Sequence, residues 1–197
     1  RDAGADPLAV ARGYRTRIAA QLGADLDGVG WCTDKMWQNF ERVAWLRRAF
    51  PGALIVHCTR HPMAVGWSIF QRAFGAAPPP FVSDLGDIAQ YIAHHDALMD
   101  AWDALGAPGT VRVCYETLVE NFEPEVTRLL GKLGLDLHPA CLAFHQQRRV
   151  VTTQSFGQVS QPLYRSALAR WRRYETHLAP MADALERLGL DPDPAPP

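Results

Sequence analysis

A continuous apolar run at residues 53–58 constrains the fold of this chain more than any other feature. The run reads ALIVHC, follows a Pro-Gly turn at 51–52 and has the length of a single β-strand. Such a run is typical of a parallel strand that is buried on both faces. Pro62 follows closely and suits the first turn of a helix, expected over residues 62–74. The sequence therefore predicts a strand that leads directly into a helix.

Further strands and helices alternate along the chain. Short strands are expected over residues 29–34 and 110–115, and an extended loop over residues 148–162. Helices are expected over residues 7–22, 39–50, 85–105, 122–133, 139–147, 166–174 and 180–188. This alternation suggests an α/β fold with a short parallel sheet. The simplest organisation is one compact domain over residues 1–190, followed by a frayed, proline-rich tail at residues 191–197.

The composition indicates a globular protein and argues against several other classes. Of 197 residues, 48% are hydrophobic and 21% are charged, which does not fit a chain that is mainly disordered. The net charge of -1 gives no electrostatic reason to expect a nucleic-acid or membrane partner. No apolar run approaches the roughly 18 residues that span a bilayer, and the start lacks a secretory signal. We therefore expect a cytoplasmic protein. Because the chain begins with Arg1, we also expect a fragment or a processed product.

The cysteines and histidines do not indicate a metal site. The four cysteines form no CxxC pair, and a reducing cytoplasm suits their wide spacing. Cys32, Cys58 and Cys114 lie in apolar, strand-like runs, so we expect small buried side chains there. His94 and His95 are adjacent in an expected helix and would point to different faces.

The turn between the strand at 53–58 and the following helix is the first candidate site. Ligands of parallel sheets bind at the carboxyl ends of strands, and a helix N-terminus offers free N–H groups to an anion. Arg60 adds a planar guanidinium that suits a phosphate. Ser68 follows about two turns later, and Arg72 would share its helix face. On spacing alone, a surface arginine and an ordinary helix serine are the favoured explanation of the pattern.

Residues 148–173 form the second candidate, because six arginines lie there without any acidic residue. Thr152, Thr153, Ser155 and Tyr164 place hydroxyl groups between them. Clustered positive charges repel one another unless an anion compensates them. The stretch therefore resembles a phosphate-binding lid. The alternatives are a basic surface patch and a nucleic-acid site, and no nucleic-acid recognition motif supports the latter. The six arginines are Arg148, Arg149, Arg165, Arg170, Arg172 and Arg173.

Two further residues lie at the ends of expected strands. Lys35 follows the strand at 29–34, where a lysine can stabilise charge during group transfer. A surface lysine with its stem on apolar neighbours is the alternative. Tyr115 ends the strand at 110–115 and can stack on a base, or it can be an ordinary half-buried tyrosine.

Taken together, these residues resemble one family, the sulfotransferases that use 3′-phosphoadenosine 5′-phosphosulfate (PAPS). The nearest look-alikes are tyrosylprotein sulfotransferase-like enzymes and bacterial sulfotransferases fused to tetratricopeptide repeats. Four stretches occur in the family's order within about residues 30–185. They read TDKMWQNF from Thr33, FPGALIVHCTRHPMAVGWSIFQRAF from Phe50, VRVCYETLVENFE from Val111 and TTQSFGQVSQPLYRSALARWRRYETHL from Thr152.

The resemblance implies a role for each matching residue. Arg60 and Ser68 match the pair that holds the 3′-phosphate, and Tyr115 matches a tyrosine that contacts the nucleotide. Lys35 and Ser155 match the residues that stabilise the transferring sulfuryl group, which needs no metal. The residues assigned to the nucleotide are Arg60, Ser68, Arg72, Tyr115, Ser155, Phe156, Gly157, Gln158, Val159, Tyr164, Arg165 and Arg170.

The chain also departs from the family's pattern. It has no counterpart of the glycine-containing loop that grips the 5′-phosphosulfate, nor of the glutamate base, both of which lie upstream of the lysine motif. His61 stands where relatives often have aspartate, and Gln161 stands where some have lysine. We therefore expect a three-layer, P-loop-NTPase-like sulfotransferase fold that is truncated at its N-terminus. A tetratricopeptide-type region can precede it.

The expected function is transfer of a sulfuryl group from PAPS to a hydroxyl acceptor, either a protein tyrosine or a small alcohol. The alternative is a non-catalytic module that binds adenosine 3′,5′-bisphosphate, or an inactive truncated product. A P-loop kinase relative is a third hypothesis, but no Walker motif supports it.

Overall fold

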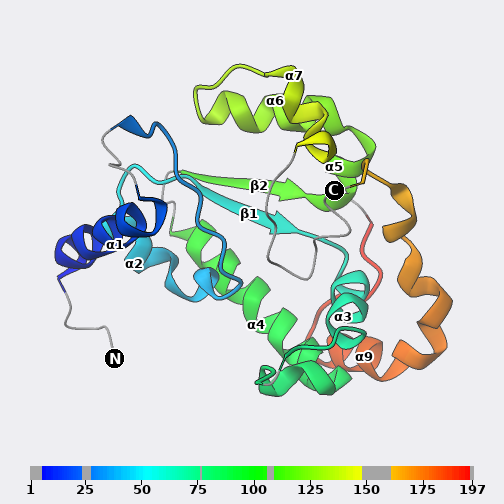
Figure 1. Ribbon diagram of the computed structural model, residues 1–197. Helices are drawn as coiled ribbons and strands as arrows, with labels where there is room; N and C mark the ends of the chain where they lie inside the picture. Colours follow the sequence, from blue (N-terminus) through cyan, green and yellow to red (C-terminus); the bar gives the residue numbers. More distant parts are fainter. Residues whose placement is uncertain (1–5, 24–27, 76, 106–108, 148–160, 196–197) are drawn as a thin grey trace. The chain divides into compact units, whose positions relative to one another are not determined.

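The chain combines helices with two strands (Figure 1), and it divides into two compact units. The computed structural model describes residues 6–23, 28–75, 77–105, 109–147 and 161–195. The first unit comprises Arg1–Ile55 and His95–Thr110, and the second comprises Val56–His94 and Val111–Pro197. The expected single domain over residues 1–190 stays a prediction.

Two helical segments pack together in the first unit. Helix α1 spans Pro7–Leu22, and the carboxylate of Asp6 caps it by accepting from the N–H groups of Leu8 and Ala9. Gly23 ends it in the left-handed conformation, which a glycine adopts without steric cost. The second segment begins as the 3₁₀ turn η2 (Asn39–Arg42) and continues as α2 (Val43–Ala49), which packs on α1.

The strand expected over residues 29–34 does not form, so that prediction is wrong. Residues 29–36 are an exposed coil in the first unit. An isolated strand has no partner for its backbone N–H and C=O groups, and the sheet of the described residues contains only two strands.

Those two strands form the small sheet that positions the candidate site. Strand β1 spans Ile55–Thr59 and strand β2 spans Thr110–Cys114; they pair and run in the same direction (Figure 1). Helices α3 (Pro62–Phe70) and α4 (Leu85–Ala104) lie between them in the chain, with the 3₁₀ turn η3 at Pro80–Ser83. The prediction of an α/β fold with a short parallel sheet is confirmed at this level.

Only one side chain of β1 is buried, which corrects the prediction of burial on both faces. His57 is buried, whereas Val56 and Cys58 are exposed. Cys32 is also exposed, because it lies in the coil that replaces the expected strand. The prediction of buried cysteines therefore fails at these two positions, while Cys114 is half-buried in β2.

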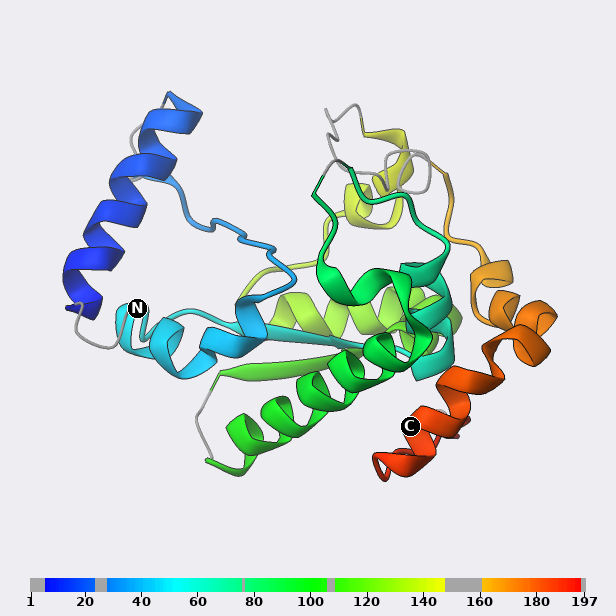
Figure 2. The same ribbon diagram turned by 90° about the horizontal axis from the view of Figure 1, so that it is seen from below.

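An apolar core of the second unit lies between α3, the first half of α4 and α9 (Glu175–Arg187). Helices α3 and α9 are neighbours in both views (Figures 1 and 2). Gly66 of α3 lies against the buried side chain of Met181 of α9, so the absence of a Cβ atom permits the close approach. Pro180 lies inside α9 rather than at its start, which corrects the helix expected over residues 180–188.

Other elements follow the strands and complete the second unit. Tyr115–Glu120 forms the unexpected helix α5 directly after β2, and α6 spans Phe122–Lys132. The helix expected over residues 139–147 divides into α7 (Pro139–Leu142) and the 3₁₀ turn η4 (Phe144–Gln146). The helix expected over residues 166–174 is instead two 3₁₀ turns, η5 (Arg165–Ala167) and η6 (Arg170–Tyr174). No helix within the described residues is long and apolar enough to cross a membrane.

Candidate functional site

Arg60 lies at the carboxyl end of β1, in the turn that leads into α3. His61 is the N-terminal cap residue of α3 and Pro62 is its first residue, so the turn is short. The Arg60 guanidinium donates through Nη2 to the Ala167 carbonyl oxygen at 2.7 Å. Its carbon lies 4.5 Å from the centroid of the Tyr115 ring, a cation–π contact. The structure thus brings Arg60 and Tyr115 together at the ends of β1 and β2.

The Arg60 guanidinium retains donor capacity beyond these contacts. Its Nε atom is buried and has no hydrogen-bond partner among the described residues. A guanidinium carries five N–H donors in a planar fork, and a buried donor without a partner is costly. An anion such as a phosphate oxygen would satisfy such a donor and match its charge.

Tyr115 and Tyr164 extend this cluster. Burial raises the pKa of the Tyr115 phenol above its usual value, while the positive charge of Arg60 opposes that shift. Tyr164 and Glu116 raise the same pKa further, so the phenol stays neutral at physiological pH. The cluster therefore presents the Arg60 cation beside the neutral phenol of Tyr115. Nucleotide sites use this combination for phosphate and base.

The Glu116 carboxylate fixes the turn behind Arg60, and the sequence analysis did not identify it. Its Oε1 atom accepts from the His61 N–H at 3.0 Å, and its Oε2 atom accepts from Cys114 Sγ at 3.2 Å. The segment after β2 is thus joined to the start of α3. Adjacency to Tyr115 was the one sequence signal that pointed to Glu116.

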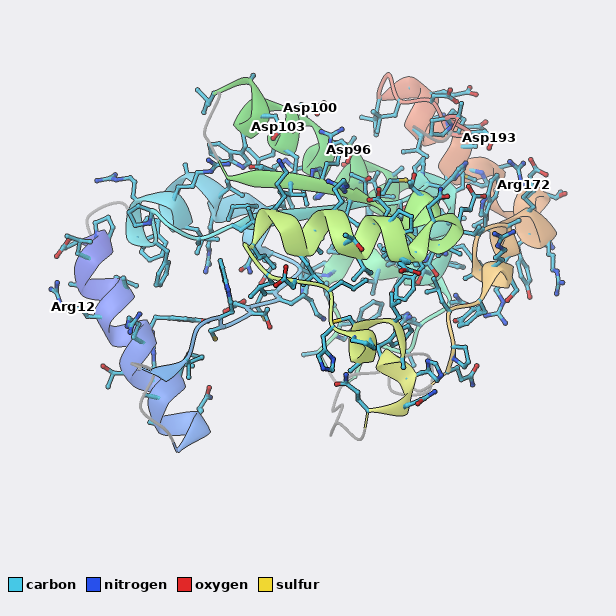
Figure 3. The ribbon with its side chains drawn as sticks, turned by 90° about the horizontal axis from the view of Figure 1, so that it is seen from above. Arg12, Asp96, Asp100, Asp103, Arg172 and Asp193 are labelled. Atoms are coloured by element: carbon cyan, nitrogen blue, oxygen red, sulfur yellow. The ribbon has the colours of Figure 1, made fainter. Side chains whose placement is uncertain are left out.

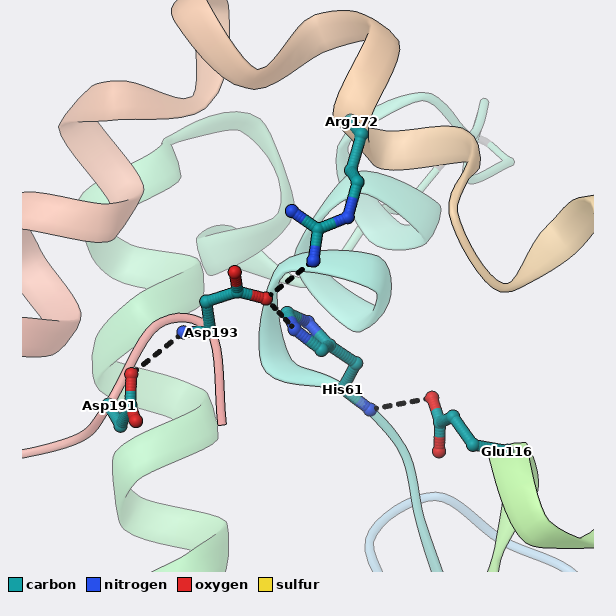
Figure 4. Close-up of polar contacts among 5 residues, drawn as sticks. All are labelled: His61, Glu116, Arg172, Asp191 and Asp193. Atoms are coloured by element: carbon teal, nitrogen blue, oxygen red, sulfur yellow. Dashed lines mark hydrogen bonds and ion pairs between the residues drawn. The ribbon is translucent and has the colours of Figure 1, made fainter. Parts of the chain in front are cut away.

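A second polar cluster surrounds His61 (Figure 4), and no sequence pattern predicted it either. His61 Nε2 lies 2.9 Å from Asp193 Oδ1, and the same oxygen accepts from Arg172 Nη2 at 2.8 Å. The His61 ring stacks on the buried ring of Trp171 at 4.8 Å. The hydrogen bond to His61, followed by that to Arg172, holds the pKa of Asp193 below its usual range. Asp193 therefore has these partners although it lies in the tail that was expected to fray.

Ser68 and Arg72 do not share the face of one continuous helix, because α3 ends at Phe70. Ser68 is half-buried in the last turn of α3, and Arg72 lies beyond the cap residue Gln71. The expected helix over residues 62–74 is thus four residues too long. Arg72 lines a cavity of about 390 Å³ together with Phe74 and other residues of the segment after α3.

The arginine-rich stretch is described only from residue 161 onward. Arg165 begins η5 and Arg170 begins η6, and both are exposed. The predicted nucleotide residues Ser155, Phe156, Gly157, Gln158 and Val159 lie outside the described residues.

Lys35 belongs to the first unit, whereas Arg60 and Tyr115 belong to the second. Its side chain is exposed and has no hydrogen bond or ion pair to any described residue. The preceding carboxylate, Asp34, accepts from Tyr14 Oη at 2.7 Å and from Asn39 Nδ2 at 3.2 Å. Tyr14 and Asp34 line a cavity of about 840 Å³ within this unit.

Comparisons with known proteins provide a separate line of evidence. The model of the sulfotransferase family matches residues 6–139. An uncharacterised protein of Aquifex aeolicus (strain VF5) is 32% identical over 155 residues, which cover 78% of this chain and 20% of that protein. The chain therefore spans about one fifth of the length of this relative.

Proposed function

The chain belongs to the sulfotransferase family, and on this premise we propose that it binds PAPS and transfers the sulfuryl group to a hydroxyl acceptor. In this reaction a bond forms between the acceptor oxygen and sulfur. The bond between sulfur and the bridging oxygen of the 5′-phosphate breaks. The products are the sulfated acceptor, a proton and adenosine 3′,5′-bisphosphate.

The surroundings of Arg60 are the observation that carries this proposal. The guanidinium lies at the carboxyl end of a parallel strand, beside Tyr115, and its buried Nε has no described partner. The carboxyl end of a parallel strand is where such folds place ligands. We assign Arg60 to the 3′-phosphate of the donor, with Ser68 as its partner on α3. Tyr115 and Tyr164 would contact the nucleoside.

The remaining proposed roles follow from the resemblance of the sequence. Residues 155–159, with Arg165 and Arg170, would cover the adenosine and approach the phosphates. Lys35 and Ser155 would stabilise the charge that develops on the departing phosphate, because such transfers depend mainly on positioning and electrostatics. No metal is required for these roles. The proposed acceptor is a protein tyrosine or a small alcohol.

Calorimetric titration with adenosine 3′,5′-bisphosphate tests the donor site, with 5′-AMP as the comparison ligand. We expect the bisphosphate to bind at least tenfold more tightly, because a charged hydrogen bond to the 3′-phosphate contributes roughly 1.5–3 kcal/mol. Arg60→Ala should remove this preference. Arg60→Lys should restore only part of it, because an ammonium lacks the planar fork.

Arg187→Ala is the matched control, because Arg187 is an exposed arginine in the last turn of α9. It should bind both nucleotides as the parent chain does. Equal affinity of the parent chain for the two nucleotides, in a sample with a cooperative unfolding transition, would contradict the proposed donor site.

A transfer assay separates an enzyme from the alternative, a non-catalytic module. The module is kept as the alternative because no described residue orients the exposed Lys35 side chain. The assay would supply PAPS with sulfur-35 in the sulfuryl group and either a tyrosine peptide or 4-nitrophenol. Label in the acceptor that disappears in Lys35→Ala would support catalysis, whereas nucleotide binding without labelled acceptor would favour the module.

A further inference from the structure

We propose that Asp193 is a positioning residue of the donor site: its carboxylate clamps His61, at the start of α3, to Arg172 in η6. The clamp keeps the segment 165–174 in the position that Arg60 requires. This inference rests on the proposed function, because the residue being positioned, Arg60, is the one assigned to the donor phosphate.

The clamp is built around a single carboxylate oxygen. Asp193 Oδ1 lies 2.9 Å from His61 Nε2 and accepts from Arg172 Nη2 at 2.8 Å (Figure 4). Asp191 Oδ1 accepts from the Asp193 N–H at 2.9 Å, which holds the local backbone turn. Arg172 and Asp193 also lie close together in the wider view (Figure 3). The C-terminal stretch is thereby joined to two elements that are distant in sequence.

The aromatic ring of Trp171 gives the clamp a rigid base. Trp171 is only 3% exposed and belongs to the core formed by α3, α4 and α9. Its ring stacks on His61, and the Arg172 guanidinium carbon lies 4.6 Å from its centroid. Both partners of the Asp193 carboxylate therefore rest on the same buried side chain. This shared support holds the two partners next to each other.

The contacts of the clamp are separate from those of Arg60. The Asp193 carboxylate therefore does not compete with the ligand for the Arg60 guanidinium. Arg60 contacts Tyr115 and the Ala167 carbonyl, whereas the neighbouring His61 contacts Trp171 and Asp193. The guanidinium of Arg60 makes no described contact with the Asp193 carboxylate. An anion bound by Arg60 would therefore not need to displace that carboxylate.

The segment 165–174 connects the two sets of contacts. Ala167 accepts the hydrogen bond from Arg60, and Arg172, five residues later, donates to Asp193. If Asp193 releases Arg172 and His61, the constraint on this segment is lost at one end. The Ala167 carbonyl then loses its fixed position, and the orientation of the Arg60 fork becomes less defined. Loss of preorganisation weakens binding without removing any group that touches the ligand.

Substitution of Asp193 tests the proposal through nucleotide affinity. We expect Asp193→Ala to weaken binding of adenosine 3′,5′-bisphosphate about three- to tenfold, since exposed ion pairs are individually weak. Asp193→Asn keeps an acceptor oxygen and should recover part of the loss. Asp183→Ala removes an exposed aspartate of α9 that has no described polar partner, and it should bind as the parent chain does.

A double-mutant cycle shows whether Asp193 acts through Arg172. If it does, Asp193→Ala and Arg172→Ala should weaken binding by similar factors, and the double variant should be no weaker than the worse single one. Fully additive losses would contradict the clamp. Tighter binding in Asp193→Ala would also overturn the proposal, because it would mean that the carboxylate competes with the ligand.

Amide hydrogen exchange tests the clamp separately from nucleotide binding. The N–H groups of Leu168 and Arg172 donate within η5 and η6, and that of Val65 donates to His61. These amides should exchange faster in Asp193→Ala than in Asp183→Ala. A parent chain that does not distinguish adenosine 3′,5′-bisphosphate from 5′-AMP would overturn the proposed donor site, and exchange would then decide whether the clamp exists. Unchanged nucleotide affinity of Asp193→Ala would overturn the inference, whether or not the exchange rates change.

Discussion

At the scale of single residues, Arg60 shows how a charged group can be held ready for a ligand. Its guanidinium is already ordered by the Tyr115 ring and the Ala167 carbonyl. A long arginine side chain loses up to about 2 kcal/mol of rotamer entropy when it is fixed. Because these contacts order the side chain before a ligand arrives, binding of the phosphate would not bear that whole cost.

Tyr14 provides a prediction about stability at alkaline pH. Burial, and then the hydrogen bond to Asp34 and its charge, raise the pKa of Tyr14 to about 12. An unfolded tyrosine titrates near 10, so the folded state holds this proton more tightly. The resulting stabilisation is complete below about pH 10 and is lost as the pH rises towards about 12. Tyr14→Phe should therefore lose less stability than the parent chain over this interval.

Urea midpoints measured between pH 9 and pH 12 would check this prediction, within the range in which unfolding is reversible. Tyr174→Phe is the control, because Tyr174 is exposed and stacks on Trp67. The urea midpoints of Tyr174→Phe should change with pH in the same way as those of the parent chain. Parallel curves for Tyr14→Phe and the parent chain would show that Tyr14 contributes nothing to this pH dependence.

At the scale of elements, the contact of α3 with α9 depends on a glycine. A Cβ atom added at Gly66 would overlap the Sδ and Cε atoms of Met181. Met181 is fully buried, so its flexible side chain has little free space in which to move. The close approach of these helices places the start of α3, and with it Arg60, on a tightly packed support.

We expect Gly66→Ala to destabilise the protein by about 1–2 kcal/mol, because overpacking outweighs the gain in helix propensity. Urea unfolding would measure the change. Gly131→Ala is the control, since a Cβ atom there meets nothing within 4 Å, and it should stabilise by up to about 1 kcal/mol. In a Met181→Ala background, Gly66→Ala should cost less. An additive double variant would argue against the steric explanation.

At the scale of the whole molecule, the sheet leaves apolar surface in contact with solvent. Val56 of β1 is 41% exposed, and Cys58 on the same strand is exposed as well. The net charge of -1 adds little repulsion between molecules near the pI of about 6.7. Exposed apolar strands with few charges favour association between molecules.

Val56→Lys should therefore reduce self-association, measured by sedimentation velocity at pH 7 over a range of protein concentrations. Leu188→Lys is the matched control, because Leu188 is 46% exposed at the end of α9 and receives the same added charge. A similar reduction in both variants would mean that net charge, and not the exposed face of β1, governs association.

The sequence determined those local elements that carry their own signals, and it placed Arg60 at the end of a strand. Helix α1 follows its own capping residues, Asp6 and Gly23, and β1 follows its apolar run. These signals act between residues that are close in the chain, so they are visible without the fold. The resemblance of the sequence likewise agrees with the family match over residues 6–139. Residues 155–159 and their proposed roles stay predictions.

Only the tertiary structure decided which side chains meet and which are covered. His61 and Asp193 are separated by 132 positions, and no local pattern indicates that they pair. The exposure of Cys58 contradicts the predicted burial of β1, and the coil at residues 29–36 contradicts the predicted strand. Both outcomes depend on what packs against the segment. A pattern specifies which residues are able to form an interaction. The free energy of that interaction arises only when the fold brings its partners within contact distance.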